Sequence, residues 1–238
     1  MSAEVVFVPG FMQRGAAWEE VAREVGERYP SRCLDFSTCT FEERVAELLG
    51  AAPPGTAVVG YSLGGRVALH AAVREPGRFA ALALVGATPG IEDEGERRAR
   101  VSADDELAAW MERAAIDEVV ERWERLPVFA GQPEELVAAQ RPGRLSHDPR
   151  QLATLLRSGS PGRLADLWNR LPRETPLLAI AGERDERYAA IARRIGPARI
   201  VPGAGHAAHL EQPAAVAALL LDFLDEHLGD RAVVDRHA

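Results

Sequence analysis

The sequence predicts an α/β protein whose parallel sheet of about six strands is flanked by helices and interrupted by one helical insertion. Short apolar runs, typical of strands buried on both faces, alternate with segments that have helical spacing. Between residues 88 and 172, by contrast, the chain is charged and helical and contains no strand-like run. A chain of 238 residues is long enough for one α/β domain with such an insertion and a substantial core.

The first strand is expected at residues 5–8, where a continuous apolar run ends at Pro9-Gly10. Helical spacing follows in residues 18–27, whose apolar positions fall on one side. The other strands are expected, in chain order, at residues 33–36, 56–59, 80–85, 177–181 and 198–201. The other core helices are expected at residues 41–51, 66–73, 188–195 and 214–228.

This alternation implies parallel strands, with helices crossing over both faces of the sheet. We therefore assign residues 1–87 and 173–238 to the α/β core. Residues 88–172 are assigned to a helical lid inserted after the fourth strand. In this architecture the lid is expected to lie over the carboxyl ends of the strands.

Composition and charge limit the partners of the protein. Hydrophobic residues make up 47% of the chain and charged residues 27%, as in ordinary soluble proteins. The formal net charge of −8 argues against nucleic acid or an anionic membrane as a partner. No lysine occurs, so all 28 basic residues are arginines, which make two-pronged contacts to carboxylates. We expect a small-molecule ligand and a monomer or small homo-oligomer.

Several features favour a cytoplasmic protein without a cofactor. The two cysteines, Cys33 and Cys39, do not make a disulfide framework and fit a reducing compartment. The first strand begins without the basic and apolar stretches of a signal peptide, and no apolar run is long enough for a membrane span. The sequence shows no metal-ligand cluster, and no G-x-G-x-x-G motif follows a strand.

The most informative motif is the pentapeptide at residues 60–64, which matches the G-x-S-x-G nucleophile elbow around Ser62. An apolar, β-branched run precedes it and a helical segment follows, as this motif requires. The sharp turn strains the serine backbone, so small residues must flank it. Gly60, Gly64 and Gly65 meet that need. We predict that Ser62 is the catalytic hydroxyl.

A reactive serine needs a histidine to accept its proton and an acid to orient that histidine. In chain order the candidates are Asp185, just past the fifth strand, and His206, just past the sixth. Both fall at the carboxyl edge of the sheet, where ligands bind in open α/β folds. Glu183 competes with Asp185, and His209 is the alternative to His206.

The negative oxygen that develops during such a reaction needs hydrogen-bond donors already aimed at it. One candidate is the backbone N–H of Leu63, directly after the serine. The other is the N–H of Phe11, in the loop after the first strand, because Pro9 cannot donate and Gly10 allows close approach. Arg66, one helical turn after Ser62, would project near the nucleophile and suggests an anionic substrate.

Together these residues resemble the α/β-hydrolase superfamily over nearly the whole chain. Within it, the chain is most similar to the 2-succinyl-6-hydroxy-2,4-cyclohexadiene-1-carboxylate synthases of menaquinone biosynthesis. The elbow and the histidine motif at residues 203–209 are shared by many members of the superfamily. More specific are the elbow arginine and the lid motif in which Pro127-Val128-Phe129 follows Trp123. Two further similar segments are residues 89–91 and 182–185.

The resemblance implies a lyase on a hydrolase fold. Ser62, activated by His206 and Asp185, would act as a base that drives elimination of pyruvate from a polycarboxylate cyclohexene intermediate. The oxyanion hole would then stabilise an enolate-like intermediate, and neither an acyl-enzyme nor a cofactor is required. The resemblance also implies a pocket for an anionic substrate. Its expected lining is Tyr61, Arg66, Arg100, Trp123 and Arg141, with Arg144 competing for the last place.

The chain departs from this family at two points. Pro9-Gly10 stands where the family usually has His-Gly, and residues 35–39 replace the usual Pro-Gly-His-Gly. The first strand corresponds to the family's third, so we expect no antiparallel hairpin. The alternative function is a carboxylic-ester or C–C bond hydrolase that uses the same triad. A third hypothesis is a non-catalytic binding module. The presence of Ser, Asp and His in the correct order argues against it.

Overall fold

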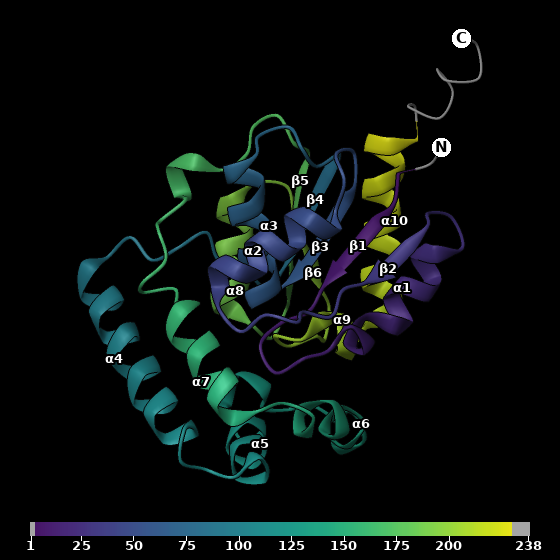
Figure 1. Cartoon of the computed structure of the whole chain (residues 1–238). Coiled ribbons are helices and arrows are strands. Elements are labelled where there is room, and N and C mark those ends of the chain that lie inside the picture. The colour runs from purple at the N-terminus through teal and green to yellow at the C-terminus, as the bar shows by residue number, and fades with distance from the viewer. Residues whose placement is uncertain (1–2, 230–238) are drawn as a thin grey trace.

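The computed structural model describes residues 3–229, in which six parallel strands form one sheet with helices on both faces (Figure 1). This confirms the predicted fold class. The strand order is β2-β1-β3-β4-β5-β6, so β1 lies next to the edge strand β2 and the four later strands are added on its other side. The strands are β1 (Val5–Val8), β2 (Ser31–Cys33), β3 (Ala57–Tyr61), β4 (Ala81–Val85), β5 (Leu177–Gly182) and β6 (Ala198–Val201).

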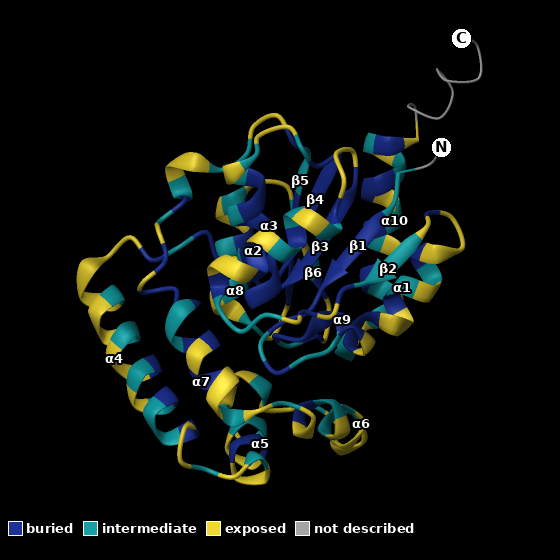
Figure 2. Cartoon of the chain, in the orientation of Figure 1, coloured by how far each residue is buried: buried dark blue, intermediate teal, exposed yellow. Residues whose placement is uncertain are grey.

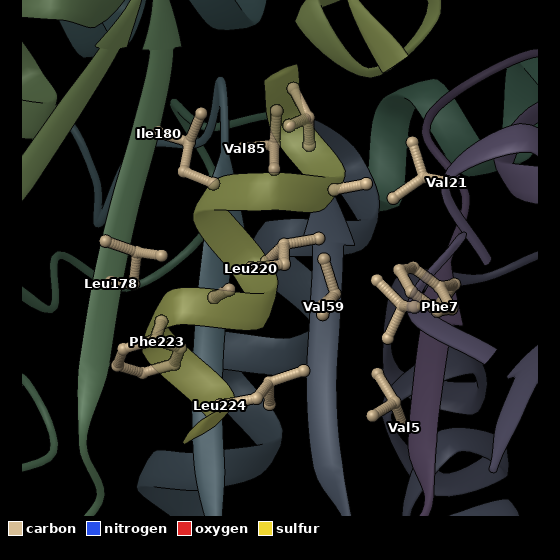
Figure 3. Packing of buried hydrophobic residues seen from close by; sticks show 14 of the residues in the cluster. Val5, Phe7, Val21, Val59, Val85, Leu178, Ile180, Leu220, Phe223 and Leu224 are labelled. Carbon is tan, nitrogen blue, oxygen red and sulfur yellow. The ribbon is translucent and has the colours of Figure 1, made fainter. Parts of the chain in front are cut away.

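Alternation along each strand divides the core into two layers, one on each face of the sheet. Val5 and Phe7 of β1 point to the face covered by α1 (Glu19–Gly26) and α10 (Pro213–Leu228), whose buried residues pack there (Figure 3). Val6 and Val8 point to the other face. That face is covered by α2 (Phe41–Ala51), α3 (Leu63–Arg74) and α8 (Glu186–Ile195).

The chain between β4 and β5, residues 86–176, is here called the inserted segment. It contains α4 (Glu94–Met111), α5 (Ile116–Glu124), α6 (Glu134–Leu145) and α7 (Pro149–Ser158). Two short 3₁₀ helices, Pro127–Phe129 and Trp168–Arg170, complete it. Its helices lie beyond the end of the sheet to which the strands point (Figure 1), and their outer faces are exposed (Figure 2). The domain boundaries at residues 87/88 and 172/173 stay a prediction.

The inserted segment has a small apolar core of its own. Residues from α4, α5 and α7 form this core, and Met12, from the loop after β1, is buried in it at 1% exposure. The partly buried Phe11 and Trp123 pack against the same core. The inserted segment is therefore anchored to the sheet through the loop that follows β1.

The main correction to the predicted elements concerns the second strand. It was expected at residues 33–36, but β2 ends at Cys33. Beyond it the Leu34 N–H still bonds to the Phe7 carbonyl, and the Asp35 side chain then accepts from the Gly15 N–H. The carboxylate thus ties this stretch to a neighbouring loop instead of continuing the sheet. A short helix, α9 (Ala208–Glu211), was also not predicted.

The turn from β3 into α3 is built on close backbone contacts. Ser62 has φ +50° and ψ −108°, a conformation that costs a non-glycine residue about 1–3 kcal/mol. A Cβ on Gly60 would lie 2.6 Å from the Gly64 carbonyl oxygen. A Cβ on Gly64 would lie 2.4 Å from the Val8 and Pro9 carbonyl oxygens. Glycine at both positions therefore lets β1, β3 and α3 approach closely enough to hold the serine.

Within residues 3–229, no helix combines the length and the apolar character needed to cross a membrane.

We expect Gly64→Ala to lower the free energy of unfolding by about 1–3 kcal/mol, because the new methyl group overpacks against the backbone of Val8 and Pro9. Gly50→Ala, near the end of α2, is the matched control, since nothing lies within 4 Å of the Cβ it adds. That change should raise stability by about 0.5 kcal/mol. Urea unfolding of both variants measures the difference, and equal effects would contradict the packing argument.

Three partly or fully buried histidines link stability to pH. Burial lowers the pKa of His70 and of His147 to about 4 and that of His209 to about 3, from an ordinary value of 6.5. Between about pH 6.5 and pH 4 the unfolded chain therefore binds protons that the folded protein does not. Stability must fall as the pH falls through this window, because protons favour the state that binds more of them.

We expect the free energy of unfolding to be flat near neutral pH and to decrease from about pH 6.5 downward. His70→Gln should reduce the slope of the free energy of unfolding against pH between pH 6.5 and pH 5. The reduction should be close to the slope that the uptake of one proton on unfolding produces. Denaturant unfolding at half-unit pH steps measures both slopes. If the curves of the wild type and of the variant run parallel, His70 does not stay neutral in the folded protein.

Candidate active site

A cavity of about 740 Å³ lies between the carboxyl ends of the strands and the inserted segment. Its floor comes from loops that follow the strands, including Phe11, Ser62, Asp185 and His206. Its roof comes from the inserted segment. The roof residues include Leu107, Trp123, Val128, Phe129, Arg144 and Leu155. The cavity therefore brings together the predicted catalytic residues and much of the predicted lid.

Ser62, His206 and Asp185 form a continuous chain of contacts on the cavity floor. His206 Nδ1 lies 2.6 Å from Asp185 Oδ2, and His206 Nε2 lies 3.3 Å from Ser62 Oγ. A carboxylate only accepts, so the imidazole carries its proton on Nδ1 and leaves Nε2 free to accept from the serine hydroxyl. The side chains of His206 and Asp185 are only 7% and 10% exposed, so bulk water does not compete for the bond between them.

Local structure holds each member of this chain in place. Asp185 is the N-cap of α8, and its Oδ1 accepts from the Tyr188 N–H at 3.2 Å. The positive end of the helix dipole also favours a carboxylate there. Gly86, after β4, has φ +57°, and a Cβ on it would lie 3.2 Å from the His206 ring. Glycine at this position makes room for the imidazole.

The two competing residues lie elsewhere. Glu183 is exposed, and its carboxylate accepts from the Gly203 N–H at 2.9 Å instead of facing His206. His209 is 1% exposed and packs on the rings of Tyr61 and Trp18, at centroid distances of 4.2 and 4.3 Å. Its Nε2 lies 3.3 Å from Gln13 Nε2, and the histidine that contacts Ser62 is His206.

Two backbone N–H groups at the cavity lack an acceptor. Leu63 is the first residue of α3, and Phe11 lies in the turn after β1. In the described part of the chain neither amide donates a hydrogen bond. Both residues line the same cavity as the Ser62 side chain. They are therefore available to an oxygen atom of a ligand.

Arg66 lies at the cavity on the first turn of α3. Its Nη1 donates to the Gly159 carbonyl, and among residues 3–229 no carboxylate lies within ion-pair distance of it. The side chain is half-buried at the cavity, and desolvation by burial lowers the pKa of Arg66 to about 10. A buried cation without a counter-ion is costly, so this position favours an anionic ligand.

The other predicted arginines are already paired. Arg100 lines the cavity, and its Nε lies 2.8 Å from Asp104 Oδ2. Arg141, expected in the pocket, is not part of the lining, because its guanidinium turns toward Glu121 and Glu124. This corrects the sequence-based choice. Its competitor Arg144 lines the cavity instead, 5% exposed at its side chain and 2.9 Å from Glu124.

Aromatic side chains complete the lining. The ring of Trp123 packs between those of Phe11 and Phe129, at centroid distances of 5.0 and 5.6 Å. Tyr61 is 3% exposed and packs against the His206 ring at 5.3 Å.

Among the lining residues that were not predicted are Gln13, Tyr188 and Arg187. Tyr188 packs on the His206 ring at 4.6 Å. Arg187 lines the cavity without an ion-pair partner in the described chain. Arg187 and Tyr188 follow Asp185 by two and three residues, in the first turn of the helix that Asp185 caps. This proximity is the only sequence signal that could have identified them as lining residues. No cluster of three or more His, Cys, Asp or Glu side chains suited to a metal ion occurs within residues 3–229.

Comparison with solved structures supports the fold. The structure of MenH from S. aureus superposes with a TM-score of 0.83 at 28% identity, and covers 94% of each chain. A thermophilic esterase from Thermogutta terrifontis reaches 0.80 at 21% identity, with 96% of this chain and 91% of that chain covered. The second likeness concerns the fold alone.

Comparison with known sequences defines the family. The family model described as "Alpha/beta hydrolase family" matches residues 5–219. The 2-succinyl-6-hydroxy-2,4-cyclohexadiene-1-carboxylate synthase of Enterobacter sp. (strain 638) is 32% identical over 95% of this chain and 93% of its own length. A Bacillus subtilis relative named for the same activity is 36% identical, over 70% of this chain and 65% of its own length. The chain therefore belongs to the alpha/beta hydrolase family and, within it, to the family of the 2-succinyl-6-hydroxy-2,4-cyclohexadiene-1-carboxylate synthases.

Proposed function

We propose that this protein is a lyase that eliminates pyruvate from a succinyl-cyclohexene polycarboxylate, with Ser62, His206 and Asp185 as its catalytic triad. The observation that carries the proposal is the placement of Arg66. It is a half-buried cation without a carboxylate partner in the described chain, at the same cavity as a serine that contacts a histidine. A neutral ester has no charged group that could pair with this cation. A substrate with several carboxylates could pair with it directly.

In the proposed reaction, His206 Nε2 takes the proton of the Ser62 hydroxyl while Asp185 stabilises the imidazolium. The serine oxygen then removes a proton from a carbon next to a substrate carbonyl. The negative charge that develops on the carbonyl oxygen is stabilised by the N–H groups of Leu63 and Phe11. As the enolate collapses, the C–O bond to the enolpyruvyl group breaks. The departing enolpyruvate takes the proton from the His206 imidazolium and becomes pyruvate, so the triad returns to its starting protonation.

The arginines would hold the substrate during these steps. Arg66 would bind a carboxylate close to the reacting carbon. Arg187, which has no ion-pair partner within residues 3–229, and Arg100 would attract a second carboxylate. Trp123 and Tyr61 would pack against the apolar ring of the substrate. An anion would offset the cost of burying Arg66, so substrate binding and orientation would depend strongly on this side chain.

The second candidate, a carboxylic-ester hydrolase, requires the same triad and the same oxyanion donors. The two reactions differ in what the cavity must recognise, so a comparison of substrates separates them.

Purified protein is expected to release pyruvate from the succinyl-cyclohexene precursor faster than it turns over a panel of nitrophenyl esters. Ser62→Ala should reduce pyruvate release by about a thousandfold or more, because the base is removed. Ser102→Ala, an exposed serine on α4, should leave the rate unchanged. A coupled lactate dehydrogenase assay follows the release. Ester turnover without any pyruvate would identify a hydrolase, and full activity of Ser62→Ala would end the triad proposal.

We expect Arg66→Ala to lower kcat/KM for the polycarboxylate by about tenfold to a hundredfold, the usual loss for a hydrogen bond to a charged group. The same change should alter turnover of a neutral ester by less than about threefold. Arg98→Ala serves as the matched control, because its side chain on the outside of α4 is 71% exposed. Equal losses for both substrates would show that Arg66 has a structural role and does not bind the anion.

A further inference from the structure

The turn that carries the Phe11 N–H is closed by a side chain. Gly10 and Gln13 are its ends, and the Gln13 N–H lies 3.4 Å from the Gly10 carbonyl oxygen, a long hydrogen bond. Met12, inside the turn, has φ +57°, which is unfavourable for a non-glycine residue. The Gln13 side chain adds a stronger bond, because its Oε1 accepts from the Gly10 N–H at 3.0 Å. The backbone of the turn is thus weakly bonded and strained, and Gln13 braces it.

The orientation of the Gln13 amide follows from this contact. The Gly10 N–H can only donate, so the amide oxygen must face it. The amide NH₂ group then points the other way, where Gln13 Nε2 lies 3.3 Å from His209 Nε2. Because the NH₂ group donates, His209 Nε2 must offer a lone pair. This contact assigns the His209 imidazole to the neutral tautomer with its proton on Nδ1, a buried atom that has no hydrogen-bond partner in the described chain.

The His209 ring is immobilised by the residues around it. It lies between Trp18 and Tyr61, and Trp18 is in turn held by a 3.1 Å hydrogen bond from its indole N–H to the Val8 carbonyl. Burial lowers the pKa of His209 to about 3, so the ring stays neutral at the pH values at which enzymes work. His209 is thus a fixed acceptor, attached to the core behind the turn.

We propose that Gln13 and His209 are positioning residues that aim the Phe11 N–H into the cavity, by way of the bonds His209–Gln13–Gly10. Pro9 has no N–H of its own with which to brace the turn. Both residues act through the backbone and neither needs to touch the substrate. This role rests on the proposed function, because it assumes that the Phe11 N–H stabilises a negative oxygen in the reaction.

The first test reads the hydrogen-bond chain without any substrate. In ¹⁵N NMR spectra of the histidine rings, His209 of the wild type should show the Nδ1–H tautomer. In Gln13→Glu, the carboxylate still accepts from the Gly10 N–H but cannot donate to His209. The ring should then carry a proton on Nε2. An Nε2–H tautomer in the wild type, or no change in Gln13→Glu, would overturn the proposed chain of bonds.

The second test reads the consequence for the reaction. Gln13→Ala should lower kcat by about tenfold to a hundredfold, since a displaced oxyanion donor loses part of the effect of a removed one. The KM should change by less than about threefold, because both ends of the Gln13 amide are already bonded within the protein, to Gly10 and His209. Gln151→Ala, an exposed glutamine at the start of α7, is the matched control and should behave as the wild type. A Gln13→Ala enzyme with unchanged kcat would overturn the positioning role.

A fluorophosphonate separates failure of this role from failure of the proposed function. The reagent labels a reactive serine, and its phosphonyl oxygen becomes negative beside that serine, so the reaction needs the same donors but not the natural substrate. Slower labelling of Ser62 in Gln13→Ala supports the role even if no pyruvate is released from any substrate. Equal labelling of both proteins overturns it. A wild type inert to the reagent would overturn the proposed role of Ser62 and, with it, this one.

Discussion

The close approach of backbone to backbone around Ser62 is the constraint on which the site depends. Gly64 brings α3 against Val8 and Pro9 at the end of β1, and Gly60 lets the end of β3 lie close to the backbone of Gly64 and Gly65. Without these contacts the serine could not hold φ +50°. The loop after β1 would also lie further from α3, so the amides of Phe11 and Leu63 could not serve one cavity. One steric requirement thus arranges both the hydroxyl and the donors around it.

The parallel sheet brings the other two members of the proposed triad to Ser62. Because all six strands run the same way, the loops after β1, β3, β5 and β6 all emerge at one edge. Asp185 and His206 lie far from Ser62 in sequence but meet it there, at 2.6 and 3.3 Å along the chain of contacts. The inserted segment then covers this edge with apolar side chains, so charged groups on the floor are shielded from bulk water. An unpaired guanidinium such as that of Arg66 interacts more strongly with an anion in such surroundings than at an exposed surface.

Much of this could be predicted from the sequence, because the signals were local. Apolar runs, helical spacing and the glycines around Ser62 identified five of the six strands, the five longer helices of the α/β core and the elbow. The predictions that were wrong or missing concern features that depend on tertiary contacts. Asp35 bonds to Gly15, and the second strand lies at residues 31–33 instead of 33–36. Glu124 pairs with both Arg141 and Arg144, but only Arg144 also lines the cavity. The bond between Gln13 and His209 joins residues 196 positions apart, and neither position carries a sequence signal for the other.

Met12 takes part in both the turn after β1 and the core of the inserted segment. It stands in the turn that presents the Phe11 amide, yet its side chain is a member of the apolar core of the inserted segment. The covering helices and the turn are therefore not independent modules. A chimera that takes residues 86–176 from a homologue would meet this side chain as part of its own interior. Recombination between family members should therefore transfer position 12 together with the helices, or the exchanged cover will be packed against a methionine that it did not evolve with.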